Sequence, residues 1–482
     1  MSVPIPRELN YSMPAPLEGL KSYELRQPTY TALTAFSGPN SVAQINLPQI
    51  PNTWLDPSST WISMEVTISL TKGANNYDPG TDIGQFKAAL LGSGLWSLFN
   101  RVQVYGNGIP IEDVISPNLF VNDYRNLSQS NPEKQGDALA FGGQDIAAIT
   151  APNVAAILGG PITSNYAFST APAAAVQQQT LRFAAPMIGL LGSGSSKLIP
   201  LFVVSHRIDL SLEALSNVIV TLTDGAAFAA DPVASMTVNR LEFVGTAITL
   251  SDRLMTDVMG SLPVPGQIAI RCNQVSTTQV VIPQGNAGSN QYQVGTRVSS
   301  CKAMLCHYQT AGCIDKIFGS VNPNLAQYAH EINGILYPQQ MADCTKIADV
   351  WGRNLQALGV WSTTNGKPCF GLSSFAVSQT AAKPSTPWLG KYDTLASLRA
   401  YAPGTPIGGR SNCFLTFMDL EVFGQKASGS SFFSGISTIG GANFLRLNFA
   451  VPTDATCTIV CFTMHDAIIT YDAAAGTVYR KI

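Results

Sequence analysis

Apolar and polar side chains alternate along three segments of the chain. From Ile62 to Thr71 every second side chain is apolar and those between are polar. The same alternation returns over residues 208–213 and 418–422. A period of two predicts β-strands with one buried and one polar face. Further strands are predicted at residues 101–105, 200–205, 218–223, 241–250, 279–283, 445–451 and 458–464.

Helical signals are few and short, and they fall at residues 251–261, 323–333 and 394–402. Two stretches rich in Gly, Ala, Ser, Gln and Pro, residues 135–179 and 362–387, have the composition of long loops. Only 12% of the 482 residues are charged, and there are 41 glycines and 30 prolines. Helical bundles carry more charge and fewer helix breakers. The chain is therefore predicted to be all-β.

Two Asn-Gly pairs, Asn107-Gly108 and Asn333-Gly334, stand nearly half the chain length apart. Each follows a strand-like segment, and each is followed by an aliphatic residue and then a proline. Asn-Gly is the typical pair of a tight β-hairpin turn. We interpret these four residues as equivalent structural turns in two tandem β-domains. The expected division is an N-terminal arm over 1–25, a first domain over 26–250 and a second over 251–482.

Charge and hydropathy narrow the choice of partners. The chain has 28 basic and 30 acidic residues, a net charge of -2, and no basic run, so sequence-specific binding of nucleic acid is not expected. Mean hydropathy is +0.14. The longest stretch without charge, between Asp145 and Arg182, is broken by prolines, asparagines and glutamines, so it is not predicted to span a membrane. Association with other protein chains explains the apolar composition better.

All nine cysteines follow residue 271. The first twenty residues lack the pattern of a secretory signal, so we expect synthesis in a cytosol-like compartment. An odd number of cysteines in one half of such a chain predicts buried free thiols rather than disulfides. They are Cys272, Cys301, Cys306, Cys313, Cys344, Cys369, Cys413, Cys457 and Cys461.

Candidate chemistry is sparse. Cys301, Cys306, His307 and Cys313 could supply soft metal ligands, but their spacing differs from that of zinc motifs. On a strand, Cys301 and Cys306 would also point to opposite faces, so core thiols are favoured. The Gly-rich segment 192–197 lacks Walker spacing and is interpreted as a loop, and residues 465–466 as a surface turn. No catalytic residue, metal or cofactor is predicted.

Five segments carry a resemblance to a known family. They are NRVQVYGNGIPIED, PMIGLLGSGSSKLIPLFVVSHRIDLSLEAL, VNRLEFVGTAITLSDRL, EINGILYPQQ and CTIVCFTMHDAIITYDAAAGTV. In this order the chain resembles the double jelly-roll major capsid proteins of icosahedral double-stranded DNA viruses, the lineage of adenovirus and the tailless membrane-containing phages. Within that lineage it is most similar to the capsid proteins of virophages and polinton-like viruses.

The resemblance implies two eight-stranded antiparallel jelly rolls in tandem, with long loops and a few short helices. Three chains would form a pseudo-hexagonal homotrimeric capsomer, and capsomers would tile an icosahedral shell around the genome. It further implies assembly inside the host cell, localisation in the virion, and contacts with neighbouring capsomers, penton proteins and minor capsid proteins. It leaves open an internal membrane beneath the shell.

Two other classes of protein compete with this interpretation. A secreted or cell-surface β-sandwich adhesin or lectin would have a secretory signal and often Asp-rich calcium loops. A jelly-roll enzyme would need converging acids or histidines, and the chain has only four histidines. We therefore expect a structural capsid subunit and no enzyme.

Overall fold

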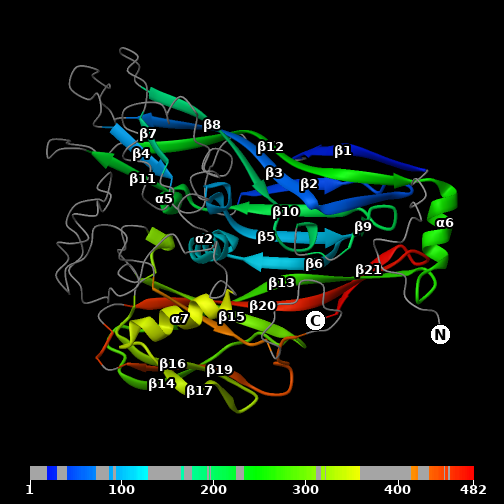
Figure 1. The fold of residues 1–482 in the computed structure, drawn as a ribbon. Helices are drawn as coiled ribbons and strands as arrows, with labels where there is room; N and C mark the ends of the chain where they lie inside the picture. The colour runs from blue at the N-terminus through cyan, green and yellow to red at the C-terminus, as the bar shows by residue number, and fades with distance from the viewer. Residues whose placement is uncertain are drawn as a thin grey trace, which may run out of the picture.

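The computed structural model describes most of the chain, in segments separated by gaps. The described residues are 19–29, 41–71, 86–90, 94–128, 164–167, 176–192, 195, 197–223, 233–310, 316–320, 322–358, 414–421, 434–449, 451–453 and 456–481. They form two β-sandwiches that follow one another along the chain and lie one above the other in Figure 1.

The first sandwich has two four-stranded antiparallel sheets. One runs in the order β1-β12-β3-β8 and the other in the order β2-β10-β5-β6, while the short β9 adds to β3. A third small sheet, β11-β4-β7, lies at one end. The strands are β1 (Leu20–Pro28), β2 (Val42–Leu47), β3 (Thr53–Thr71), β4 (Phe86–Leu90), β5 (Phe99–Gly106), β6 (Ile109–Ile115), β7 (Ser164–Ala167), β8 (Val176–Pro186), β9 (Ile199–Pro200), β10 (His206–Leu212), β11 (Ile219–Thr223) and β12 (Val233–Leu250).

The second sandwich repeats this pairing. Its sheets run in the orders β13-β20-β15-β18 and β14-β19-β16-β17, and β21 pairs with β20. In both sandwiches the eight main strands pair as first-eighth-third-sixth and second-seventh-fourth-fifth, which is the jelly-roll topology. The predicted all-β fold of two tandem jelly rolls is therefore confirmed. The strands are β13 (Gln267–Ile282), β14 (Gly288–Gln293), β15 (Cys301–Thr310), β16 (Leu325–Ile332), β17 (Ile335–Asp343), β18 (Leu415–Asp419), β19 (Asn443–Phe449), β20 (Cys457–Asp472) and β21 (Thr477–Lys481).

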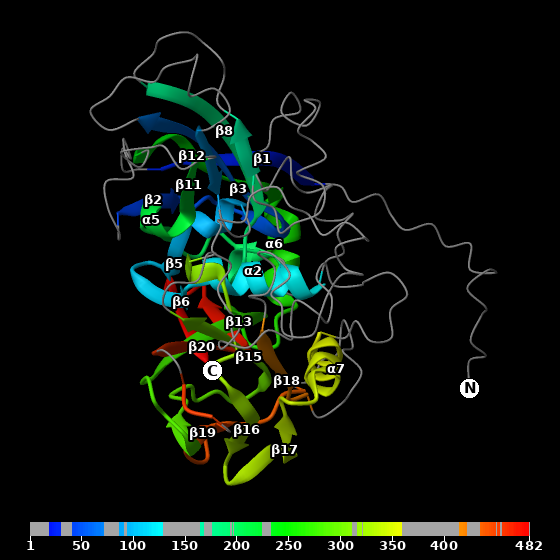
Figure 2. The same cartoon turned by 90° about the vertical axis from the view of Figure 1, so that its left-hand side faces the viewer.

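Short helices connect or cover the strands. The helix α6 joins the two sandwiches at one end of the molecule (Figure 1), and α2 lies where the sandwiches meet (Figure 2). No helix of the described segments is long and apolar enough to cross a membrane. The helical elements are η2 (Gly94–Leu98), α2 (Pro117–Ser128), η4 (Gly189–Leu191), α5 (Leu215–Val218), α6 (Asp252–Gly260), η5 (Lys316–Phe318) and α7 (Ile347–Ala357).

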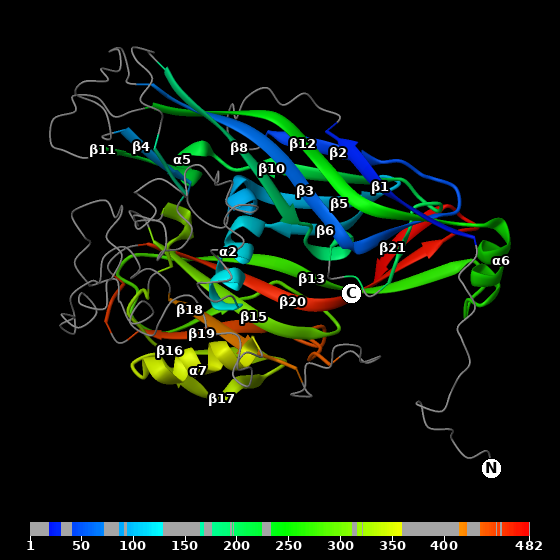
Figure 3. The same cartoon turned by 45° about the horizontal axis from the view of Figure 1, so that its top comes forward.

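The two sandwiches share part of their apolar packing. One cluster of buried residues fills the first sandwich and continues into one end of the second, and another cluster fills the rest of the second. Figure 3 shows β6 lying beside β13, with β21 reaching the same region. The second sandwich contributes Ile268, Ile270, Cys272, Ala467, Ile469, Tyr471 and Val478 to the first cluster. This continuity positions the two jelly rolls relative to each other.

Several local predictions were right and others wrong. The helix at 251–261 is α6, and the Ser251 hydroxyl caps it by accepting from the Leu254 amide. The helix predicted at 323–333 is wrong, because these residues form β16, paired on both sides by β17 and β19. Of the strand predicted at 200–205, only Pro200 lies in a strand, and a turn follows. The region 394–402 and all of 362–387 lie outside the described residues.

The predicted N-terminal arm is also too long. Strand β1 begins at Leu20 and pairs with β12 along its whole length, from Leu20 opposite Leu250 to Pro28 opposite Glu242. Residues 20–25 therefore belong to the first sheet. Leu25 is the only residue of β1 that is fully buried, so the alternation that reveals other strands is missing here.

Candidate functional site

The four turn residues singled out from the sequence lie at matching places in the two sandwiches. Asn107 and Gly108 connect β5 to β6, and Asn333 and Gly334 connect β16 to β17. These are the fourth and fifth main strands of each jelly roll. Flanking residues pair directly, Gly106 with Ile109 and Ile332 with Ile335, so each loop has two residues.

Backbone conformation explains the Asn-Gly sequence. The φ angles are 51° at Asn107 and 84° at Gly108, and 52° at Asn333 and 81° at Gly334. Positive φ at both central residues defines the hairpin turn that matches the twist of the strands. A Cβ atom at either glycine would meet nothing within 4 Å, so there is room for a side chain. Glycine is favoured because of the positive φ angle.

Each turn is held by its asparagine. The Asn107 side chain donates to the carbonyl of Gly476 at 3.0 Å, and the Asn333 side chain donates to that of Ser437 at 2.8 Å. Gly476 belongs to the turn between β20 and β21 of the second sandwich. The first turn therefore joins the two sandwiches, whereas the second turn is held within its own sandwich.

A buried carboxylate lies at the junction of the sandwiches. Glu112 on β6 is 3% exposed, and its Oε2 accepts the Leu190 amide at 2.9 Å. Burial raises the pKa of Glu112 to about 7, against the effect of the Leu190 hydrogen bond and the nearby Arg480. Gly189 has a φ of 69°, and a Cβ there would lie 2.0 Å from Glu112 Oε1. A side chain at position 189 would clash with the Glu112 carboxylate, so the position of Glu112 requires glycine at 189.

Two buried hydrogen bonds cross the junction nearby. His206 Nε2 lies 3.1 Å from the Tyr471 hydroxyl, and burial lowers the pKa of His206 to about 4. The Gln274 amide donates to the carbonyl of Ile111 at 3.3 Å. Since His206 and Ile111 lie in the first sandwich and their partners in the second, these bonds fix the register of the two jelly rolls.

Helix α2 of the first sandwich is tied to the second by a contact between a histidine and an aspartate. His307 Nδ1 lies 2.8 Å from Asp123 Oδ2, and His307 Nε2 lies 3.1 Å from the carbonyl oxygen of Ile317. Both side chains are buried. Phe120 of the same helix packs on Phe462, with ring centroids 5.5 Å apart. Polar and apolar contacts thus act together at α2.

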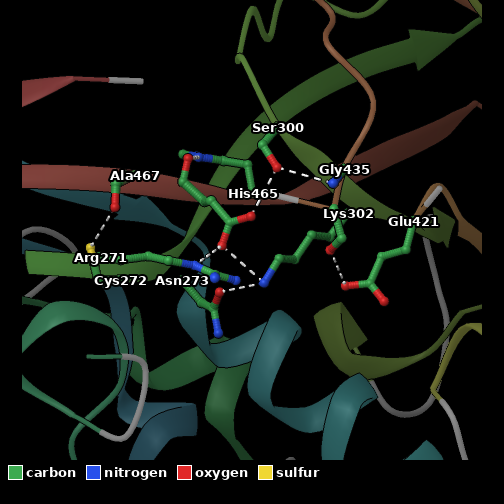
Figure 4. A network of polar contacts seen from close by, with 11 residues as sticks. Arg271, Cys272, Asn273, Ser300, Lys302, Glu421, Gly435, His465 and Ala467 are labelled. Carbon is green, nitrogen blue, oxygen red and sulfur yellow. Dashed lines mark hydrogen bonds and ion pairs between the residues drawn. The ribbon is translucent and has the colours of Figure 1, made fainter. Parts of the chain in front are cut away.

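A second buried carboxylate, Asp466 on β20, organises a polar network within the second sandwich. It accepts from Arg271 Nε at 3.0 Å, Lys302 Nζ at 2.9 Å and Ser300 Oγ at 2.8 Å. Lys302 also donates to the Asn273 side chain, and Figure 4 shows these groups converging. The prediction that residues 465–466 form a surface turn is wrong, because both are buried within β20. This network joins three neighbouring strands, and we assign it no chemical step.

The candidate metal ligands are used in other ways. Cys301, Cys306 and His307 all lie on β15, where His307 is engaged by Asp123, and Cys313 lies outside the described residues. Among the residues that the structure describes, no three His, Cys, Asp or Glu side chains come together as metal ligands. The opposite faces expected for Cys301 and Cys306 stay a prediction. The pairing of β15 with β20 has a β-bulge between Cys301 and Ala303.

The described residues of the Gly-rich segment, Gly192, Ser195 and Lys197, belong to no helix or named strand. Ser195 forms an isolated β-bridge with Cys272 on β13. At Gly192 an added Cβ would lie 1.9 Å from the carbonyl oxygen of Met187, so the backbone is closely packed. The loop therefore contributes to the junction.

Sequence reasoning found the turns but not the groups of the junction. Glu112 and Asp123 were not selected, and Asp466 of the second sandwich was interpreted as part of a surface turn, because a charged residue on or beside a strand usually faces water. Glu112 and the neighbouring Asp113 together interrupt the apolar segment IPIEDVI, and no local signal separates the buried Glu112 from Asp113, which pairs with Arg101.

Comparisons with known proteins establish the fold. No protein-family model and no curated protein matches the chain. A chain in the cryo-EM structure of the Sputnik virophage is similar over 100% of this chain and 93% of its own length, with a TM-score of 0.58 and 14% identity. The Faustovirus major capsid protein covers 95% of this chain and 92% of its own length, with a TM-score of 0.52 and 11% identity.

The mavirus major capsid protein is similar over 100% of this chain and 95% of its own length, with a TM-score of 0.52 and 9% identity. In each case almost the whole of both chains is matched, so both sandwiches and their mutual placement are shared. The resemblance expected from the sequence is confirmed at the level of the fold. The chain has the double jelly-roll fold found in viral major capsid proteins.

Proposed function

We propose that this chain is the major capsid protein of an icosahedral double-stranded DNA virus. One observation carries the proposal: a single chain holds two complete jelly rolls of identical strand order, and full-length matches to it include major capsid proteins. The role is structural, and we assign no catalytic reaction to it. The alternative of an adhesin or lectin is not favoured by these comparisons.

The proposed working unit is a homotrimer. Three chains with two similar jelly rolls each give six similar lobes, which can tile a surface as a pseudo-hexagon. We divide the lobes between β12 and β13, at residues 250 and 251. The repeated Asn-Gly hairpins support the equivalence of the lobes, because they occupy the same strand connection in both.

Composition supports repeated lateral packing. The chain combines 45% hydrophobic residues with a net charge of -2. Large permanent interfaces are more apolar than ordinary surfaces. A net charge near zero also limits repulsion between many copies held edge to edge. Both properties suit a subunit that is packed permanently against other copies of the same chain.

We further propose localisation in the virion shell after assembly inside the host cell. Neighbouring capsomers, penton proteins and minor capsid proteins would be its partners, and a membrane beneath the shell remains part of the proposal to be tested. Sequence-specific contact with the genome is not part of it, because the chain lacks a basic excess.

Light scattering across a dilution series tests the trimer. The expected mass is three times 51.2 kDa, retained down to the lowest concentration at which the chain stays folded. A monomer at micromolar concentration with full thermal stability would contradict the proposal.

A further inference from the structure

Two free cysteines face each other in the core of the second sandwich. Cys306 on β15 and Cys461 on β20 are direct partners in the antiparallel pairing. Their Sγ atoms lie 3.4 Å apart, and neither side chain is exposed. Both thiols are free. This separation is that of a thiol hydrogen bond, and a covalent bond would draw the sulfur atoms closer still.

The backbone at this pair suits a disulfide. Directly opposed residues of antiparallel strands have Cα atoms about 4.5 or 5.5 Å apart, depending on the type of pair. Disulfides span Cα separations of roughly 4.4 to 6.8 Å. Either type of pair therefore lies in the permitted range. Bond formation would need rotation of the two side chains rather than movement of the strands.

Other cysteines on the described strands lack such a partner. Cys272 is opposite Ala467, Cys301 is opposite His465, and Cys457 is opposite both Ile282 and Thr310. Among the cysteines on the described strands of the second sandwich, Cys306 and Cys461 alone are direct partners in the strand pairing.

A histidine from the opposite sheet completes the cluster. His330 on β16 is 1% exposed, and neither ring nitrogen has a hydrogen-bond partner among the described residues. It lies near Cys306, and the thiol of Cys461 together with this imidazole lowers the pKa of Cys306, while the pKa of Cys461 is raised. Since His330 acts on Cys306, Cys306 is the thiol whose proton this imidazole is placed to take first.

We propose that Cys306 and Cys461 form an oxidation site, converted by hydrogen peroxide into a disulfide that joins β15 to β20. The Cys306 thiolate attacks one peroxide oxygen, the O–O bond breaks, and Cys306 becomes a sulfenic acid as water is released. The Cys461 sulfur then attacks the Cys306 sulfur, and the S–O bond breaks with release of a second water. One peroxide is reduced, and two thiols are oxidised.

His330 is the group placed to handle the proton. It can take the thiol proton of Cys306 before the first step and return it to the departing oxygen. Peroxide is the fitting oxidant because it is little larger than water, whereas a bulky disulfide reagent would not fit a site with no exposed surface.

Local opening gives access to the site. On the side away from Cys461, Cys306 is paired with Thr416 of β18. Strand β18 has only five residues and forms the edge of its sheet. An edge strand is paired on one side only, so it can detach while the central strands of the sheet stay paired. Peroxide would therefore enter while β18 is detached, and the central strands would stay paired.

Thiol counting with disulfide mapping tests the proposal. Chain purified under reducing conditions is treated with hydrogen peroxide, denatured in an alkylating reagent and digested without reduction. We expect loss of two of the nine thiols and one linked peptide pair containing Cys306 and Cys461. The midpoint of thermal unfolding should rise by on the order of 5 °C.

Matched variants make the result specific. Cys306→Ser and Cys461→Ser should each prevent the loss of the thiol pair, and Cys457→Ser, also buried on β20, should leave the Cys306–Cys461 link intact. His330→Gln should slow its formation about tenfold or more without changing which residues are linked. A disulfide to a different cysteine, oxidation of Cys306 to sulfinic acid with Cys461 unchanged, or no reaction even in urea just below the unfolding transition would overturn the proposal.

Discussion

His307 and Asp123 form a buried hydrogen bond across the junction of the two jelly rolls, with Nδ1 and Oδ2 2.8 Å apart. The other ring nitrogen of His307 faces the carbonyl oxygen of Ile317. His307 therefore has a polar partner at each ring nitrogen, one in the first jelly roll and one in the second. The junction is thus held by specific polar contacts as well as by apolar packing.

Removing His307 should loosen this junction. His307→Ala leaves buried Asp123 without its histidine partner, and we expect the free energy of unfolding to fall by about 2 to 3 kcal/mol. Arg182→Ala is the control, because Arg182 pairs with Glu65 at the surface with 83% of its side chain exposed. That change should cost less than about 1 kcal/mol. Equal losses in urea denaturation would show that the buried pair has no special role.

The two Asn-Gly turns should respond alike to substitution. Gly108→Ala and Gly334→Ala each force alanine into positive φ, at a cost of about 1 kcal/mol. Gly295→Ala is the matched control, because its Cβ would also meet nothing within 4 Å but its φ is not positive. Thermal unfolding of the three variants gives the comparison. A penalty at only one of the two turns would argue against their equivalence.

Glu112 should make stability depend on pH. Its folded pKa of about 7 lies above the ordinary value of 4.5, so the folded chain keeps a proton that the unfolded chain releases between these values. Stability contributed by this group is therefore full below pH 4.5 and is lost as pH rises through 7.

Glu112→Gln removes that dependence. The variant and the original chain should be equally stable near pH 4.5, whereas at pH 8 the variant should be more stable by about 3 kcal/mol. Comparing the two chains at each pH cancels the opposite contributions of His206 and His465, whose pKa values burial lowers to about 4. If the original chain is the more stable at pH 8, Arg480 stabilises the ionised Glu112 carboxylate, and the pKa of Glu112 is not raised on folding.

Local sequence patterns predicted much of the fold. Strict alternation located β3 and β10, where one face meets the opposite sheet and the other is polar. The Asn-Gly pairs located two hairpins, because their conformation depends on residues that are adjacent in sequence. A helix was also predicted at 251–261, and the structure shows it as α6, capped by Ser251.

Long-range packing explains why the other predictions from the sequence were wrong or missing. Residues 325–332 have reasonable helix propensity, but pairing with two neighbouring strands makes them β16. Glu112 and Asp466 are buried because other segments cover their faces, and a pattern of period two carries no information about such covering. The Cys306–Cys461 pair depends on a register between strands far apart in sequence.

Electron microscopy of the purified chain tests the central claim most directly. A capsid subunit of this fold should appear as a three-fold particle with six similar lobes, each the size of one jelly roll, and at high concentration these particles should pack into sheets or closed shells. Single two-lobed particles that stay separate at every concentration would contradict the assignment to a capsid.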